Sequence, residues 1–225
     1  RVFAGDASTI AEMGAGDVVS FQDIRGTEQS LKLARSPKQT KMIDGSTKIG
    51  TVVVGAGYSA FVGQELFPVL EDMEHGGVKV WRPVESYAAA GTVMMDEIGK
   101  ISSTRFVEVE DMIKYGGAGA LTTNAIDDTG VDNMYVSGTN YDVFPILYVG
   151  SDSFGTIGFE GDVARVNTVM PAADAHNDVF GKKGVVAISW YHGLLIYRPE
   201  RIRQILTVAK LSWWHIHCSL ATIVN

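Results

Sequence analysis

The alternation of hydrophobic and polar residues predicts one long helix in the N-terminal part of the chain. Over residues 17–36 the apolar side chains fall largely on one helical stripe, and Pro37 ends the pattern. The residues of this stripe are Val18, Phe21, Ile24, Leu31 and Ala34. Gly26 weakens the middle of the predicted helix and favours a bend there.

Short apolar segments rich in β-branched and aromatic residues predict strands, which are separated by glycine-rich turns. They cover residues 51–54, 78–81, 105–109, 145–149, 165–170 and 185–197. Their irregular spacing and the small number of helices indicate an α+β fold rather than a regular βαβ alternation. Residues 115–120 and 127–140 are expected to be surface loops, which would make contacts in an assembly or act as lids in an enzyme.

The end of the C-terminal half has the pattern of a scaffold. The strand predicted over residues 185–197 is followed at once by Arg198-Pro199-Glu200 and an amphipathic stretch. This predicts a helix over residues 199–211 with the proline in its first turn. His192, within the strand, is interpreted as a packed or edge histidine instead of a general base.

The stretch TVVVGAGYSA, residues 51–60, comes close to the G-x-G-x-x-G/A fingerprint of a dinucleotide-binding turn. That motif requires an uninterrupted helix after the glycines, because the helix N-terminus faces the pyrophosphate. Here Gly63 and Pro68 interrupt the helix, and Asp72 and Glu74 lie in a polar run instead of at a strand end. We therefore favour a strand and turn of another fold, and a Rossmann-type oxidoreductase with NAD or FAD remains the alternative.

Composition and charge narrow the function classes. A chain of 225 residues that is 46% hydrophobic can bury a core, as one elaborate domain or two small ones. The net charge of -7 argues against a basic surface that coats nucleic acid.

Cys218 is the sole cysteine, which excludes an internal disulfide and fits a reducing compartment. No apolar run approaches the length of a membrane helix, so no membrane partner is expected.

The search for chemical motifs predicts neither catalytic residues nor a cofactor or metal. The sequence has no G-x-S-x-G elbow, Walker loop, H-E-x-x-H or paired C-x-x-C. His215 and His217 would lie on one face of a strand as two metal ligands, but a third ligand is not evident. The segment that carries them, residues 212–218, is interpreted as a C-terminal strand that packs on a neighbour.

A local basic cluster follows the predicted helix: Lys32, Arg35, Lys38 and Lys41. It would suit an acidic neighbouring subunit or a phosphate surface. The alternative is a solvated helix end whose cations lie favourably near the C-terminal end of the helix dipole.

Five ordered blocks resemble the major capsid proteins of N4-like tailed phages, over residues 4–211. The blocks around residues 97–108 and 190–200 are the most specific. The five blocks are LKLARSPKQTKMIDGS, GYSAFVGQELFPVLEDM, RPVESYAAAGTVMMDEIGKISSTRFVEVEDM, YDVFPILYVGSDSFGTIGF and ISWYHGLLIYRPERIRQILTVAKL. The resemblance implies the Hong Kong 97-type capsid fold, which has a peripheral and an axial domain.

Domain boundaries follow from this resemblance. Residues 1–50 would form part of the peripheral domain and include its spine helix. Residues 51–169 would supply most of the axial domain, with GAGYSA as a turn that leads into a strand and with Tyr58, Phe61 and Val62 in the core. Residues 170–211 would return to the peripheral domain, and residues 212–225 would form a C-terminal tail.

The resemblance also implies a function without a reaction. Many copies would assemble as hexamers and pentamers into an icosahedral shell around double-stranded DNA, which would touch the inner face without sequence specificity. Such a protein would reside in the virion after assembly in the bacterial cytoplasm, with portal, scaffolding and decoration proteins as further partners. The candidate subunit-interface residues are Lys32, Arg35, Glu71, Glu74, Arg198, Glu200 and Arg201.

One departure from the family concerns the extended parts. Proteins of this fold carry an N-terminal arm and an extended hairpin that overlap neighbouring subunits, and no hairpin is predicted before the expected spine helix. Either that part lies upstream of Arg1, or the chain contacts its neighbours differently. A portal, decoration or scaffolding protein is the alternative within phage assembly.

Overall fold

The computed structural model describes residues 1–43, 51–87, 93–122, 133–157, 164–171, 180, 182–190 and 193–211. The contacts divide the chain into two units. Unit 1 comprises Arg1–Ser151 and the segment from Glu200 onward, and unit 2 comprises Asp152–Pro199. His192, the metal-ligand candidates His215 and His217, and Cys218 lie outside the described residues. In the described part of the chain, no helix is long and apolar enough to cross a bilayer.

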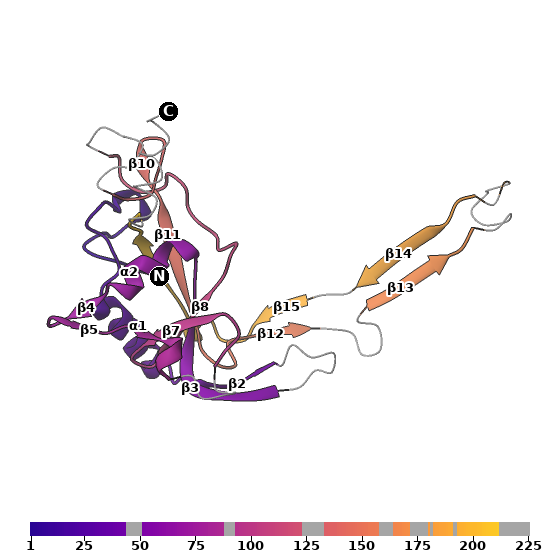
Figure 1. Cartoon of the computed structure of the whole chain (residues 1–225), viewed down its shortest axis with the longest axis horizontal. Helices are drawn as coiled ribbons and strands as arrows, with labels where there is room; N and C mark the ends of the chain where they lie inside the picture. The colour runs from indigo at the N-terminus through magenta and orange to yellow at the C-terminus, as the bar shows by residue number, and fades with distance from the viewer. Residues whose placement is uncertain are drawn as a thin grey trace. The chain divides into compact units, whose positions relative to one another are not determined.

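Unit 1 is built on a mixed eight-stranded sheet (Figure 1). Seven strands follow the order β1-β16-β11-β3-β8-β7-β6, and β2 pairs with β3. The pairs β1–β16 and β3–β8 are parallel, and the other neighbours are antiparallel. Their bounds are β1 (Val2–Phe3), β2 (Gln39–Ile43), β3 (Thr51–Val62), β6 (Arg82–Pro83), β7 (Glu97–Ile101), β8 (Thr104–Glu108), β11 (Val143–Val149) and β16 (Ile202–Val208).

One face of this sheet forms the main core with two helices. Because side chains alternate between faces along a strand, every second residue of the central strands is buried in this core: Tyr58, Ala60, Val62, Phe144, Ile146 and Tyr148. Helix α1 (Phe21–Leu33) contributes Ile24 and Leu31, and α2 (Phe67–Glu71) contributes Leu70. The α+β prediction thus agrees with the strand-rich mixed structure.

A second, smaller core combines Val143, Leu206 and Val208, from the other face of β11 and β16, with Met13, Met134 and Tyr141. Short elements complete the unit. They are β4 (Glu74–His75), β5 (Val78–Lys79), β9 (Val136–Ser137), β10 (Asn140–Tyr141) and the 3-10 helices η1 (Ile10–Glu12), η2 (Gln64–Leu66), η3 (Val84–Ser86) and η5 (Pro199–Arg201). The segment 115–120, predicted as a loop, is held by backbone hydrogen bonds between Tyr115 and Val143.

The predicted N-terminal helix is confirmed as α1. Ser20 caps it, since its backbone N–H donates to Asp23 Oδ2 at 2.9 Å and its side chain accepts from the Asp23 N–H. The helix runs through Gly26 and ends at Leu33, a few residues before Pro37.

The predicted helix over residues 199–211 is wrong. Only Pro199–Arg201 form a 3-10 turn, and the following residues form β16. This strand lies inside the sheet between β1 and β11, where Ile205 and Leu206 are fully buried on opposite faces. Burial on both faces places apolar residues at adjacent positions, here Ile205 and Leu206. Together with Ile202 they have the i, i+3, i+4 spacing of a helical stripe, which explains the wrong prediction.

The expected turn at GAGYSA is also wrong. Gly55, Ala56 and Gly57 lie inside the continuous strand β3, with Gly57 paired to Gln39 of β2. The strand has no turn at these glycines and no helix begins directly after them, so the phosphate cradle of a dinucleotide fold does not form here. Of the expected core residues, Tyr58 and Val62 are buried, whereas Phe61 is half-buried.

The glycines of β3 make room for an arginine from the neighbouring strand. A Cβ atom on Gly55 would lie 2.3 Å from Nη2 of Arg105, which belongs to the parallel strand β8. A Cβ atom on Gly57 would lie 3.0 Å from the carbonyl oxygen of Ser103 and 3.1 Å from Cγ of Arg105. The glycines therefore serve the close approach of a side chain, not a ligand.

Unit 2 consists of two antiparallel ladders. The strand β12 (Phe154–Ile157) pairs with β15 (Gly193–Ile196), and β13 (Ala164–Val169) pairs with β14 (Val185–Trp190) (Figure 1). The single strand predicted over residues 185–197 is thus divided into two. The backbone N–H groups of Tyr197 and Arg198 both donate to the carbonyl oxygen of Ser153, at 2.9 and 3.1 Å, and close the base of the unit.

We predict opposite effects for two glycine substitutions. Gly55→Ala should lower the free energy of unfolding by about 1–3 kcal/mol, because the methyl group displaces the Arg105 guanidinium. Gly26→Ala should raise it by about 0.5–1 kcal/mol, because Gly26 lies exposed in α1 with open space around its Cα. Urea unfolding followed by circular dichroism measures both. Equal stability of Gly55→Ala and wild type would contradict the steric role of Arg105.

Candidate assembly surfaces and a buried polar network

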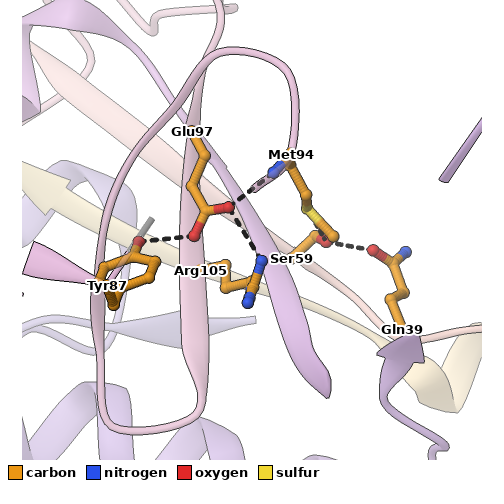
Figure 2. A network of polar contacts seen from close by, with 6 residues as sticks. All are labelled: Gln39, Ser59, Tyr87, Met94, Glu97 and Arg105. Atoms are coloured by element: carbon orange, nitrogen blue, oxygen red, sulfur yellow. Dashed lines mark hydrogen bonds and ion pairs between the residues drawn. The ribbon is translucent and has the colours of Figure 1, made fainter. Parts of the chain in front are cut away.

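A buried ion pair joins β7 and β8. Nη1 of Arg105 lies 3.0 Å from Oε2 of Glu97, and the two side chains are 8% and 0% exposed (Figure 2). The same carboxylate accepts hydrogen bonds from the Tyr87 hydroxyl at 2.6 Å and from the Met94 backbone N–H at 2.8 Å. Both carboxylate oxygens of Glu97 are therefore engaged by partners within the chain.

Further contacts extend this network to β2 and β3. The Ser59 hydroxyl donates to the side-chain oxygen of Gln39 and lies 3.4 Å from the Met94 sulfur (Figure 2). Burial, then the hydrogen bond to Glu97 and its charge, raise the pKa of Tyr87 well above its ordinary value. The hydroxyl therefore stays protonated as a donor at neutral pH. Because the pair is so enclosed, removing either partner would leave an uncompensated buried charge at the place where these strands meet.

A second buried carboxylate fixes helix α1 to the turn between β7 and β8. Glu28 is 3% exposed and accepts hydrogen bonds from the Ser102 hydroxyl, the Ser103 N–H and the Thr104 hydroxyl, at 3.1, 3.0 and 2.8 Å. Three donors satisfy this charge without a cation. The turn that they come from borders the first of two charged hollows on unit 1.

The basic hollow has a volume of about 570 Å³. It is lined by five cations together with Phe21, Val80, Ser102 and Ser103: Lys32, Lys38, Lys79, Arg82 and Lys100. Lys79 forms an exposed ion pair with Asp72 at 3.4 Å, and the Lys100 ammonium lies 4.2 Å from the centre of the Tyr87 ring. Within the described residues, no carboxylate pairs with Lys32, Lys38 or Arg82.

The acidic hollow has a volume of about 620 Å³. Its lining comprises four carboxylates together with Phe61, Gln64, Val107 and Val109: Asp96, Glu108, Glu110 and Asp111. Among the described residues, no cation forms an ion pair with these four side chains. The two hollows lie at opposite ends of the β7–β8 hairpin, since Ser102 and Ser103 form its turn while Asp96 and Glu108 flank its open end.

Unit 2 presents an uncovered apolar face. Residues paired directly across β13 and β14 share a face, and one face carries Val166 opposite Ile188, together with Val186 and Trp190. These four side chains are 60–67% exposed. The opposite face carries the pair Arg165 and Ser189 and is more polar. The β13–β14 sheet of unit 2 is thus amphipathic.

The structure brings only one of the sequence-predicted interface residues into a charged hollow, namely Lys32. Arg201 is half-buried, and its guanidinium donates to the Ser151 carbonyl oxygen at 3.4 Å. The remaining predicted residues are exposed and line neither hollow: Arg35, Glu71, Glu74, Arg198 and Glu200. Of the predicted basic cluster, Lys38 also lines the basic hollow. The interface role of the seven residues remains a prediction.

Sequence reasoning missed Lys79, Arg82 and Lys100, which complete the basic hollow. They lie on separate strands, and only the pairing of β6 with β7 places Arg82 directly opposite Lys100. It also missed Glu97 and Arg105, although both fall in one of the two most specific blocks. The available signal was that charged residues alternate with apolar ones in two neighbouring strand-like segments, because charges that become buried in a sheet must be paired.

We predict that Glu97→Gln lowers the free energy of unfolding by about 3–5 kcal/mol, because it leaves the Arg105 charge buried without a partner. The double variant Glu97→Leu with Arg105→Met should lose less than Glu97→Gln alone, since no buried charge remains. Urea denaturation of the three proteins provides the comparison. A loss from the double variant larger than that from Glu97→Gln would contradict this account.

Comparison with known proteins finds similarity to phage capsid proteins. No protein-family model matches it. It is 32% identical over 216 residues to the major capsid protein of Pseudomonas phage KPP21. The aligned region covers 93% of this chain and 53% of the KPP21 protein. Its structure is similar to the capsid of Ralstonia phage GP4, with a TM-score of 0.56, 14% identity, and coverage of 93% of this chain and 52% of that one. The chain spans about half the length of both proteins, and over that half it shares the fold of the GP4 capsid chain.

Proposed function

We propose that this chain is part of a major capsid protein that assembles into the icosahedral shell around the double-stranded DNA of a tailed phage. The similarity to the KPP21 capsid protein over nearly the whole chain supports this function, and so does the shared fold with the GP4 capsid. Hexamers and pentamers, the N4-like group and the Hong Kong 97-type architecture are the finer parts of the proposal. The proposed role is structural and belongs to the virion.

The observation that carries this proposal is the uncovered apolar face of unit 2. A two-stranded sheet is marginally stable alone in water, and four large apolar side chains of this face are 60–67% exposed. Apolar area of this kind becomes favourable when another protein surface covers it. In a shell, every copy offers the same face to a neighbour, so one such contact is repeated throughout the assembly.

The domain assignment belongs to the same proposal. Helix α1 would be the spine helix of the peripheral domain, residues 51–169 would supply most of the axial domain, and residues 170–211 would return to the peripheral domain. Unit 2 would provide the extended hairpin that the family uses to overlap a neighbouring subunit. This position, after the helix in the chain, would account for the lack of a predicted hairpin before it.

The proposed partners are further copies of the protein, portal, scaffolding and decoration proteins, and the packaged DNA. The net charge of -7 suits a container, because repulsion from the phosphates limits adhesion of the DNA to the inner face. Assembly would take place in the host cytoplasm.

We expect Ile188→Thr combined with Trp190→Thr to impair shell assembly. Threonine preserves the strand propensity of both positions but removes most of their apolar area, so the critical concentration for assembly should rise at least about tenfold. The capsid protein as its gene encodes it would be examined by negative-stain electron microscopy and light scattering. The variant Ser189→Thr, on the opposite face of β14, serves as the control and should assemble like wild type.

Two results would contradict the proposed function. A wild-type protein that forms no closed shell or capsomer ring at any concentration would argue against a shell protein. Normal assembly of the Ile188→Thr, Trp190→Thr variant would show that this face of unit 2 is not a subunit contact.

A further inference from the structure

We propose that the cations of the basic hollow of one copy contact the carboxylates of the acidic hollow of the next copy, in a head-to-tail contact on unit 1. This inference rests on the proposed function, because it names a specific contact within the assembly. The cations of the basic hollow are Lys32, Lys38, Lys79, Arg82 and Lys100, and the carboxylates of the acidic hollow are Asp96, Glu108, Glu110 and Asp111. It is separate from the apolar face of unit 2.

The charges of the two hollows are complementary and largely unsatisfied. The basic hollow has no carboxylate in its lining, and the acidic hollow has no cation. Among the described residues, only Lys79 of the basic hollow forms an ion pair, with the exposed Asp72. Complementary potentials of this kind steer association and fix which surfaces meet.

The pairing of β6 with β7 supports an acidic occupant. Arg82 and Lys100 lie directly opposite each other in an antiparallel pair, where like charges repel and destabilise the strand pair. Carboxylates from another molecule would remove this repulsion. The repulsion between Arg82 and Lys100, which destabilises the isolated chain, would therefore be smaller in the complex.

The geometry excludes neutralisation within one copy. The turn of the β7–β8 hairpin borders the basic hollow, and its open end borders the acidic hollow. The five residues of β8 separate the two ends by roughly 13 Å, which exceeds the Debye length of about 8 Å at physiological salt. Contact between two unlike surfaces of identical copies is heterologous, and it closes into a ring when the rotation between copies permits.

Another copy of the chain is favoured over nucleic acid as the occupant. The chain carries a net charge of -7, so its summed charge repels phosphates. The acidic hollow is present on every copy. A second copy therefore supplies the complementary charge at the same concentration as the hollow itself.

The test is a charge exchange in the capsid protein as its gene encodes it. Arg82→Glu alone and Glu110→Arg alone should each raise the critical concentration for assembly at least about tenfold, because each places like charges in contact. The double variant, Arg82→Glu with Glu110→Arg, should return to within about threefold of wild type. Lys210→Glu alters the net charge as Arg82→Glu does, at an exposed position outside both hollows, and should assemble normally.

The two single variants also provide a test that needs no shell. Arg82→Glu retains an intact acidic hollow, and Glu110→Arg retains an intact basic hollow. A mixture of the two should therefore associate more tightly in sedimentation velocity than either variant alone, and 0.5 M NaCl should weaken that association by screening.

The outcomes separate this inference from the proposed function. Shells that form equally well from wild type and both single variants, or a double variant without rescue, would overturn the contact but leave the function intact. Loss of double-stranded DNA binding in Arg82→Glu, measured by fluorescence anisotropy with assembly unchanged, would assign the hollow to nucleic acid instead. A wild type that forms small oligomers but no shell would contradict the function, and the exchange would still be measured on those oligomers. A strictly monomeric wild type would overturn both.

Discussion

The close approach of Arg105 to the glycines of β3 is the constraint on which the centre of unit 1 depends. The Arg105 side chain packs against Gly55 and Gly57, and its Nη1 lies 3.0 Å from Oε2 of the buried Glu97 of β7. A charge of either sign without the other would be costly in this environment, because the water that normally solvates it is excluded. The ion pair therefore requires both strands and the space that the glycines leave, and so it links β3, β7 and β8 as one unit.

This arrangement also organises the surface. The hairpin of β7 and β8 is fixed internally by Glu97 with Arg105, and at its turn by Glu28 of helix α1. Its two ends therefore hold defined positions, with the cations near the turn and the carboxylates near the open end. A rigid hairpin with opposite charges at its ends is suited to repeated contacts between identical copies, because little conformational entropy is lost when a contact forms.

The two units differ in how their stability arises. Unit 1 buries aromatic and aliphatic side chains between a sheet and two helices. Unit 2 has two two-stranded sheets, and one apolar face of the β13–β14 sheet is exposed in the single chain. Since paired strands without a covering layer are only marginally stable, the folding of unit 2 and its contacts with another surface are coupled in the proposed shell.

The sequence by itself determined the α1 helix, the positions of several strands such as β3, β8, β11 and β13, the mixed fold class and the resemblance to capsid proteins, because these depend on local periodicity, capping and residue order. It did not determine the conformation of residues 202–208, where burial on both faces of the sheet outweighs the helical spacing. Nor did it determine the role of GAG, since glycines that admit a phosphate and glycines that admit an arginine look alike in sequence. The charged hollows came only from tertiary structure, because Arg82 and Lys100, or Asp96 and Glu110, become neighbours only through the strand pairing that brings distant segments together.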